Sequence, residues 1–296
     1  MSSKVSTTGY IVAAALEKLA RLPEWKKYFT EEMILLNAAF TRYTRDSLVK
    51  YCISLEPPRL AIWLMDRLYI PGLMQHYLFR KRFIEQRTIN AIAAGAVQII
   101  NLGAGFDTLN LRLAKAYPEV QFFEIDLPHT QAAKGRTLQH IHYSVPPNVT
   151  FIPVDLARTK LGFVFSTEKK LTSESSTCLI MEGVLVFLSE SEVKALFLDL
   201  HRLFQCPVTV IFSARAVANG RSNRSRGMID LMLKKNSEEI KWHCPGRSMK
   251  SFISELGYVL KEQITYKELQ RLYRNESEIR NVPDEDENCY VVQKLQ

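Results

Sequence analysis

The sequence predicts an α/β fold, in which a doubly wound, mainly parallel sheet of seven strands follows a helical N-terminal cover. From Val97 onward, short apolar runs of five or six residues alternate with helical patterns, as expected for strands buried on both faces. The first 95 residues show helical patterns without the polar and apolar alternation typical of a strand. We therefore expect a single domain of 296 residues.

Seven apolar runs are predicted as strands. The first five alternate with helices, whereas the last two are expected to pair across a long polar connection. The predicted strands span residues 97–102, 121–125, 150–154, 177–181, 208–212, 257–264 and 288–294. The connection ends in the acidic cluster Asp284–Glu287, which we expect to be a solvated loop.

The strongest helical pattern lies between the fourth and fifth predicted strands. Ser189 can cap this helix, and Glu192 occupies the capping-box position three residues later. Apolar residues then recur at i, i+3, i+4 and i+7 over three turns: Val193, Leu196, Phe197, Leu200, Leu203 and Phe204. A helix here is the crossover that two parallel strands require.

The composition excludes several classes of protein. A balance of 39 basic against 31 acidic residues gives a net charge of +8, which favours an anionic partner without identifying it. The five cysteines include no C-x-x-C pair, and His140 and His142 do not share a helix face, so no metal site is expected. No apolar stretch reaches the roughly 20 residues of a membrane span. We expect a cytoplasmic protein with reduced thiols.

A glycine loop follows the first predicted strand. Gly103 and Gly105 stand directly before a helix that Asp107 can cap, and glycines there let the backbone approach a ligand at the helix N-terminus. The dinucleotide fingerprint requires a further glycine where this chain has Thr108. The loop therefore favours a nucleoside ligand without an exposed pyrophosphate.

Acidic residues end the next three predicted strands. Glu124 and Asp126 close the second strand, Asp155 the third and Glu182 the fourth. Because the carboxyl ends of parallel strands meet at one edge, these side chains are expected to surround one ligand that carries a ribose and a positive group. The set favours S-adenosylmethionine over NAD, because no nearby basic residue serves the phosphates of NAD.

Four blocks of sequence within residues 80–204 occur in an order typical of one family. They are Gln98–Leu109 with Arg112-Leu113, Phe123–Pro128, Val154–Leu156 and Met181–Leu188. Together they resemble the leucine carboxyl methyltransferase family, which includes the phosphatase methyltransferases and their bacterial relatives. The resemblance implies a Rossmann-like methyltransferase sheet and S-adenosylmethionine as the cofactor.

The resemblance also implies roles for individual residues at matching positions. It implies that Gly103 lines the methionine portion of the cofactor, that Asp126 holds the ribose, and that Glu182 meets the methionine end. Asp155 and Leu156 would then meet the adenine.

Two basic positions of the family have more than one counterpart in this sequence. The resemblance implies that Arg80 binds the cofactor's carboxylate, with Arg82 as the alternative if the alignment shifts by two positions. For the family's upstream cofactor-binding lysine, Lys26, Lys27 and Lys50 remain open.

Departures from the family pattern leave the methyl acceptor open between a peptide C-terminus and a small acid. Ala214-Arg215 stands where the phosphatase methyltransferases have Tyr-Glu, and the N-terminal Asp-Pro-Tyr segment has no counterpart. A carboxylate is ionised at pH 7 and needs no general base. The basic segment 215–250 is expected to form a lid, with Arg215 as the clamp for the acceptor's carboxylate.

These predictions divide the chain into an N-terminal cover (1–95), a cofactor-binding core (96–214), the lid insertion (215–250) and the C-terminal strands (251–296). Two other functions remain as alternatives. An NAD-dependent oxidoreductase is disfavoured by Thr108 and by the lack of a hydride-transfer partner. A non-catalytic module that binds an adenosyl cofactor or nucleic acid would need exposed aromatics among its basic residues, and the lid segment offers only Trp242.

Overall fold

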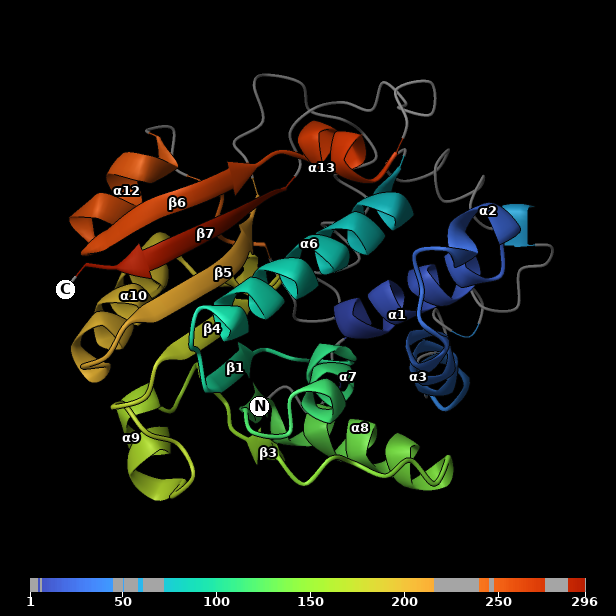
Figure 1. Ribbon diagram of the computed structural model, residues 1–296, viewed down its shortest axis with the longest axis horizontal. Helices are drawn as coiled ribbons and strands as arrows, with labels where there is room; N and C mark the ends of the chain where they lie inside the picture. Colours follow the sequence, from blue (N-terminus) through green and yellow to red (C-terminus); the bar gives the residue numbers. More distant parts are fainter. Residues whose placement is uncertain are drawn as a thin grey trace.

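The computed structural model describes residues 5, 7–44, 50, 58–60, 72–215, 240–244, 248–274 and 287–295. Across this part of the chain, a seven-stranded sheet carries helices on both faces (Figure 1). The predicted α/β fold is therefore confirmed. Residues 216–239, which form most of the predicted lid, lie outside the described residues.

The sheet has the strand order β3-β2-β1-β4-β5-β7-β6. Its strands are β1 (Gln98–Leu102), β2 (Gln121–Asp126), β3 (Val149–Pro153), β4 (Thr177–Met181), β5 (Val208–Ala214), β6 (Tyr258–Ile264) and β7 (Asn288–Lys294). The first five pair in parallel, and β7 runs antiparallel between β5 and β6. All seven predicted strands are confirmed to within two residues at each end. The order reverses between β1 and β4, where open α/β sheets bind their ligands.

Helices make up the described parts of the N-terminal cover, as predicted. They are α1 (Thr7–Ala20), α2 (Pro23–Lys26), α3 (Glu31–Arg42) and α6 (Leu73–Ala93). The remaining helices are α7 (Leu109–Ala116), α8 (Pro128–His140), α9 (Leu161–Thr167), the 3₁₀ turn η1 (Leu185–Phe187), α10 (Glu190–Leu203), α12 (Met249–Glu255) and α13 (Tyr266–Tyr273). The capping box at the start of α10 is confirmed, since Ser189 and Glu192 bond reciprocally. No helix within the described ranges is both long enough and apolar enough to cross a bilayer.

Strand alternation divides the hydrophobic core into two layers. Ile99 of β1 and Phe122 of β2 pack with α1, α3, α6, α7 and α13 on one face of the sheet. Their neighbours Ile100 and Phe123 pack with α9, α10 and α12 on the other face. The central strands are therefore buried on both sides, which explains their continuous apolar sequence.

The connection between β6 and β7 contains a helix that the sequence analysis missed. Helix α13 begins with a capping box formed by Thr265 and Glu268 and packs beside α6 (Figure 1). The capping pattern is visible in the sequence, but the helix is short and lies within the connection that the sequence predicts to be polar. Because β7 enters the sheet between β5 and β6, its first residue, Asn288, pairs with Ala214 at the end of β5.

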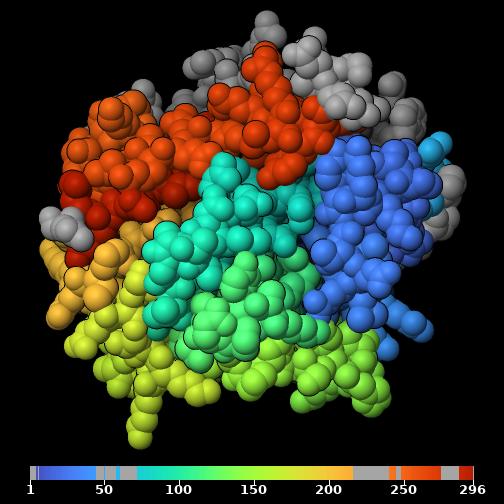
Figure 2. Space-filling model, in the orientation of Figure 1, coloured from blue at the N-terminus to red at the C-terminus, as the bar shows by residue number. Residues whose placement is uncertain are grey.

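The N-terminal cover extends over the glycine loop. Figure 2 shows the N-terminal helices in blue forming one surface with α6 and the helix that follows β1. The ring of Tyr10 in α1 stacks on Phe106 of the loop with ring centroids 4.0 Å apart, and Phe40 of α3 contacts the same ring at 5.4 Å. Helices α1 and α3 thus help to enclose the carboxyl edge of the sheet.

Candidate functional site

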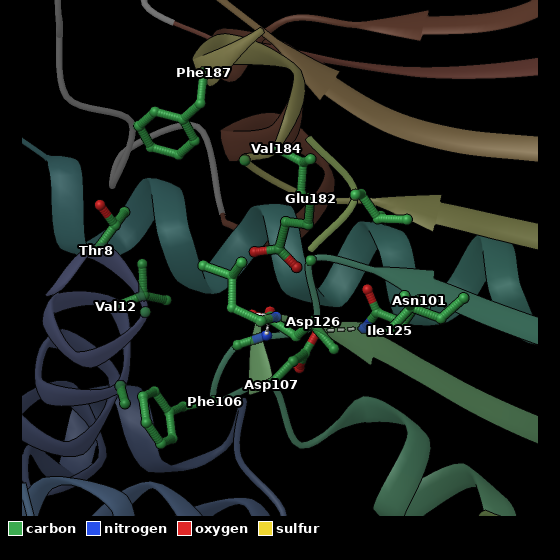
Figure 3. Close-up of a pocket in the computed structure, with 18 of the residues that line it drawn as sticks. Thr8, Val12, Asn101, Phe106, Asp107, Ile125, Asp126, Glu182, Val184 and Phe187 are labelled. Atoms are coloured by element: carbon green, nitrogen blue, oxygen red, sulfur yellow. Dashed lines mark hydrogen bonds between the residues drawn. The ribbon is translucent and has the colours of Figure 1, made fainter. Parts of the chain in front are cut away.

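A cavity of about 730 Å³ opens at the carboxyl edge of the sheet, between the strand ends and α1 (Figure 3). Its volume is typical of a small-molecule site. Eight of the ten predicted site residues line it: Arg80, Gly103, Gly105, Asp107, Asp126, Asp155, Leu156 and Glu182. Glu124 and Arg215 do not.

Two glycines of the loop adopt a backbone conformation that would be strained for any other residue. Gly103 and Gly105 have φ values of 69° and 50°, in the left-handed region that favours glycine. A Cβ at Gly103 would also lie less than 3.0 Å from Cγ2 of Val184. The amide of Gly105 donates to Oδ2 of Asp126 at 2.6 Å, which ties the loop to the end of β2.

Asp107 stands one residue before Thr108, the N-cap of α7, so it is not the N-cap that the sequence predicts, although its carboxylate serves the first amides of the helix. Its Oδ1 accepts hydrogen bonds from the amides of Thr108 (2.6 Å) and Leu109 (3.1 Å) at the start of α7. Burial would raise the pKa of Asp107, but the ammonium groups of Lys81 and Lys134 and the backbone bond outweigh this effect and lower the pKa to about 2. Asp107 therefore faces the cavity as a carboxylate.

Asp126 also keeps acceptor capacity towards the cavity. Its two oxygens accept one backbone hydrogen bond each, from Gly105 and from Leu127 at 2.6 Å. Each carboxylate oxygen has two lone pairs, so one acceptor position remains on each. Burial raises the pKa of Asp126, and the two backbone bonds oppose that shift.

Glu124 corrects one expectation, because it lies beneath the site instead of in it. It stands two residues inside β2, about 7 Å from the strand end, and its side chain is 0% exposed. Its Oε2 accepts from Nζ of Lys134 at 2.6 Å, and Lys134 also donates to the carbonyl of Asp107 at 2.5 Å. Burial raises the pKa of Glu124 to about 7 against the effect of Lys134. The pair supports the glycine loop from below.

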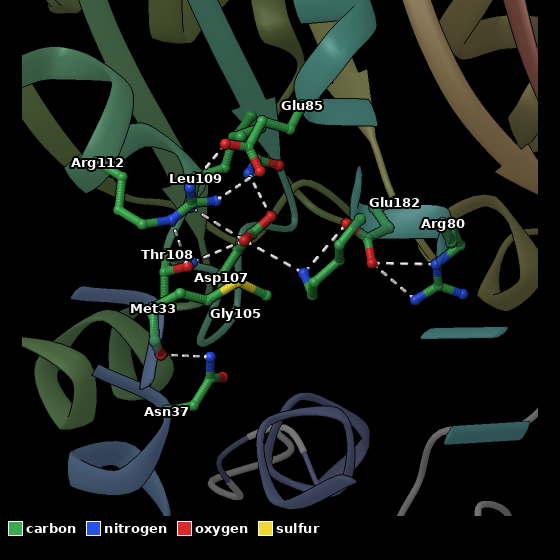
Figure 4. Close-up of polar contacts among 12 residues, drawn as sticks. Met33, Asn37, Arg80, Glu85, Gly105, Asp107, Thr108, Leu109, Arg112 and Glu182 are labelled. Carbon is green, nitrogen blue, oxygen red and sulfur yellow. Dashed lines mark hydrogen bonds and ion pairs between the residues drawn. The ribbon is translucent and has the colours of Figure 1, made fainter. Parts of the chain in front are cut away.

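A buried cluster of charges forms one wall of the cavity (Figure 4). Glu182 at the end of β4 accepts at Oε1 from Nε (3.0 Å) and Nη2 (2.8 Å) of Arg80. Lys81 lies with Nζ 3.2 Å from both Glu182 Oε2 and Asp107 Oδ1. These contacts favour Arg80 over Arg82, which pairs with Glu85 and does not line the cavity.

Glu287 joins the same cluster, which corrects the expectation of a solvated acidic loop for this residue. Its side chain is 17% exposed, accepts from Nη1 of Arg80, and has Oε2 2.9 Å from Nε2 of His76. Burial would raise the pKa of Glu287, but Arg80 and His76 hold it well below its usual range. The other members of the acidic cluster lie outside the described residues.

Lysine positions also differ from the expectation. Lys26, Lys27 and Lys50 do not line the cavity, whereas Lys81 does. The sequence signal for Lys81 is its place in the basic run Arg80-Lys81-Arg82, ahead of the first strand of the sheet.

The segment after β5 contributes a different cation from the one expected. Arg215 follows Ala214 at the end of β5 but does not line the cavity. Lys241 lines it, and its amide donates to the carbonyl of Val186 in η1 at 2.8 Å. Trp242 is only 2% exposed and belongs to the core, so it is not an exposed aromatic for stacking on bases.

The cavity has a polar side and an apolar side. Asp107, Asp126 and Glu182 face one part of it, whereas Val12 of α1 and Phe187 of η1 face another (Figure 3). Among the described lining residues there is no histidine, tyrosine or cysteine. In the same described ranges, no group of three or more His, Cys, Asp or Glu side chains is arranged to hold a metal ion.

Sequence comparisons connect the chain to one family of proteins. A family model described as leucine carboxyl methyltransferase matches residues 45–201, more than half of the chain. A Bacillus subtilis (strain 168) protein named "Putative S-adenosyl-L-methionine-dependent methyltransferase YktD" is 25% identical over 203 residues, or 66% of this chain and 65% of that protein. A Mycobacterium marinum (strain ATCC BAA-535 / M) protein with the same description is 31% identical over 135 residues, 43% of this chain and 39% of its own. The matches thus span less than two thirds of either relative.

Two solved structures share the fold. A "putative methyltransferase" from Thermobifida fusca YX aligns with a TM-score of 0.58 and 14% identity, over 82% of this chain and 90% of its own. A DUF574 family protein from Streptomyces avermitilis MA-4680 aligns with a TM-score of 0.60 and 11% identity, over 99% and 98%. At these identities the similarity concerns the fold alone.

Proposed function

The chain belongs to the leucine carboxyl methyltransferase family, and from this premise we propose that it transfers a methyl group from S-adenosylmethionine to a carboxylate oxygen. The observation that carries the proposal is a cavity in which a left-handed glycine loop meets Asp126, Asp155 and Glu182 at the carboxyl edge of the sheet. That edge is where sheets of this type bind nucleoside ligands.

The lining residues fit the parts of this cofactor. The two acceptor positions that remain on Asp126 match the two hydroxyls of a ribose. Gly103 leaves space that a side chain would fill, beside Val184. Asp155 and Leu156 lie beyond the end of β3, where they would hold the adenine. These assignments agree with those implied by the family resemblance.

The charges of the cavity fit the methionine end of the cofactor. When bound, S-adenosylmethionine supplies a methyl group activated by a positive sulfur. Glu182 and Asp107 favour the positive groups at this end through their carboxylates. Arg80 has five N–H donors, of which Glu182 and Glu287 engage three, so two remain for the cofactor's carboxylate.

The acceptor subsite follows from what is left of the lining. Val12, Phe187 and Leu188 offer apolar surface, and Lys241 offers a positive charge. A carboxylate is already ionised at pH 7, which agrees with a described lining that holds no histidine or tyrosine to act as a general base. The protein then contributes positioning and electrostatic stabilisation. The acceptor is a carboxylate with an apolar body.

Cofactor binding is the first test of this proposal. Calorimetry with S-adenosylmethionine, S-adenosylhomocysteine and NAD should show binding of the first two and none of NAD. Binding of NAD without either adenosyl ligand would instead support the oxidoreductase alternative, for which the missing glycine at Thr108 already gives little support.

Transfer of a labelled methyl group is the second test. Peptides ending in free or amidated leucine, and octanoate with octanamide, separate a peptide acceptor from a small apolar acid. Label should enter the free acids alone, and transfer to the amides with equal efficiency would refute a carboxylate acceptor. Binding of S-adenosylmethionine without transfer to any acid would support a non-catalytic module.

Lys241 and Arg215 form a matched pair for locating the acceptor's charge partner. Lys241→Met should raise the KM for the acid by about tenfold, the loss of one charge-assisted contact, and leave the Kd for S-adenosylhomocysteine unchanged. Arg215→Met should change neither value, because Arg215 does not line the cavity. The reverse pattern would restore Arg215 as the clamp.

A further inference from the structure

We propose that Glu287, directly before β7, is a positioning residue that fixes Arg80 for the carboxylate of the bound cofactor. The inference rests on the proposed function, since it assigns a partner to the amino-acid end of that cofactor. Glu287 lies 86 residues beyond the end of the family match at residue 201. No pattern around it in the sequence indicated a role in the site.

Two carboxylates hold the guanidinium of Arg80 from different strands. Glu182 at the end of β4 takes Nε and Nη2 at a single oxygen, Oε1, at 3.0 and 2.8 Å. Glu287 takes Nη1 from the start of β7. Because opposite parts of the planar group are bound, the guanidinium can neither rotate about its long axis nor slide along Glu182. The side chain of Arg80 is only 6% exposed, and that exposure is towards the cavity that it lines.

Glu287 is itself held by side chains that do not line the cavity. Its Oε2 lies 2.9 Å from Nε2 of His76, one turn before Arg80 on α6. The hydroxyl of Ser213 on β5 also donates to Glu287, and it accepts from the amide of Gly183 at 2.9 Å. The carboxylate is therefore anchored by three elements, α6, β5 and β7, which is the arrangement expected of a residue that orients another.

Glu182 and Glu287 share the donors of Arg80 and Lys81 between them, so Glu287 also affects the contacts of Glu182. With Nη1 of Arg80 engaged by Glu287, Oε1 of Glu182 accommodates Arg80 and Oε2 remains for Lys81 at 3.2 Å. Without Glu287, Nη1 would have to turn to Glu182 or to solvent, because a buried guanidinium donor without an acceptor is costly. Either movement takes the two unused N–H groups away from their place in the wall.

Two ligands separate this role from a structural one. S-adenosylhomocysteine carries the amino-acid carboxylate, and 5′-methylthioadenosine has the same nucleoside but lacks the amino-acid end. Glu287→Asp keeps the charge but shortens the reach by one methylene, whereas Glu287→Gln keeps the reach and an acceptor oxygen but removes the charge. Calorimetry of both ligands with both variants measures the contribution of reach and of charge.

Glu287→Asp should raise the Kd of S-adenosylhomocysteine by about tenfold, the lower end of the loss measured when the outer partner of a metal ligand is removed, and leave the Kd of 5′-methylthioadenosine unchanged. Glu287→Gln should raise the first Kd by a smaller factor. Equal weakening of both ligands by Glu287→Asp would mean a general structural effect and overturn the proposal. Tighter binding of S-adenosylhomocysteine by Glu287→Gln would also overturn it, since Glu287 would then compete with the ligand for Arg80.

Glu85, on the helix α6 that also carries Arg80, provides a matched control. It is a buried glutamate paired with Arg112 at 2.8 Å, and it does not line the cavity. Glu85→Gln should lower stability without changing the ratio of the two Kd values, and a change in that ratio would contradict the assignment to Glu287. If the wild-type protein binds neither ligand, the proposed function is contradicted. If the wild-type protein binds both ligands and Glu287→Asp leaves the ratio of their two Kd values unchanged, only the role of Glu287 is contradicted.

Discussion

Adding one methyl group at Gly103 tests how tightly the glycine loop is constrained. Alanine in the left-handed region, where Gly103 has φ 69°, costs about 1 kcal/mol more than glycine. The added Cβ would lie less than 3.0 Å from Cγ2 of Val184, and relieving such an overlap costs about 2 kcal/mol. We therefore expect Gly103→Ala to lower the free energy of unfolding by about 3 kcal/mol. Since Val184 lines the cavity, its displacement should also weaken the binding of S-adenosylhomocysteine.

Gly95 provides the matched control, because it isolates the backbone contribution. It also has a positive φ, 99°, but an added Cβ there would have no heavy atom within 4 Å, and it does not line the cavity. Gly95→Ala should therefore cost only about 1 kcal/mol and leave ligand binding unchanged. Equilibrium unfolding in urea gives both free energies, and calorimetry gives both affinities.

A double variant separates the overlap from the backbone strain. Val184→Ala removes the methyl groups that the new Cβ would meet, so the pair Gly103→Ala and Val184→Ala should recover about 2 kcal/mol relative to the sum of the single variants. The reasoning is refuted if Gly103→Ala costs no more than Gly95→Ala and the coupling energy is below about 0.5 kcal/mol.

Two further predictions concern buried charges. Lys134→Met should lower the free energy of unfolding, measured in urea, by about 3–5 kcal/mol, because it leaves Glu124 buried without its counter-ion. Adding Glu124→Leu should recover most of that loss. If the loss is not recovered, Lys134 stabilises the protein through its bond to Asp107 instead. The pKa of Asp107 lies at about 2 in the folded protein, below its ordinary value of 3.8. The carboxylate therefore stabilises the folded protein above about pH 4, and this stabilisation is lost as the pH falls towards 2. Between these two values the free energy of unfolding falls by about 1.4 kcal/mol per pH unit. Asp107→Asn should remove this slope, and parallel stability profiles for the two proteins between pH 5 and 3 would contradict the assignment.

Residues next to one another in sequence were the most predictable part of the site. Gly103, Gly105 and Asp107 follow a strand within a few residues, and local chemistry fixes their behaviour: a positive φ favours glycine, and a carboxylate next to a helix start accepts hydrogen bonds from its first amides. Asp126 was likewise predictable, because the end of an apolar strand places it at the carboxyl edge.

Glu124 shows the limit of the same reasoning. Glu124 lies only two residues before Asp126 in the same strand, and their positions near the strand end predict the same role for both. The two residues differ in how far they lie from the carboxyl edge of the sheet. Glu124 lies inside the strand, where Lys134 of α8 is its partner, whereas Asp126 is the last residue of the strand and lines the cavity. The prediction for Arg215 has the same weakness. Arg215 directly follows the end of β5 but does not line the cavity.

The sequence by itself determined the family, the seven strands and the glycine loop, because apolar runs, turn residues and caps act over a few neighbouring positions. Only the tertiary structure decided which charged side chains meet. Arg80 contacts Glu182 across 102 positions of sequence and Glu287 across 207. Such pairs form because burial leaves each charge in need of a partner, and which partner is within reach depends on how β7 enters the sheet between β5 and β6.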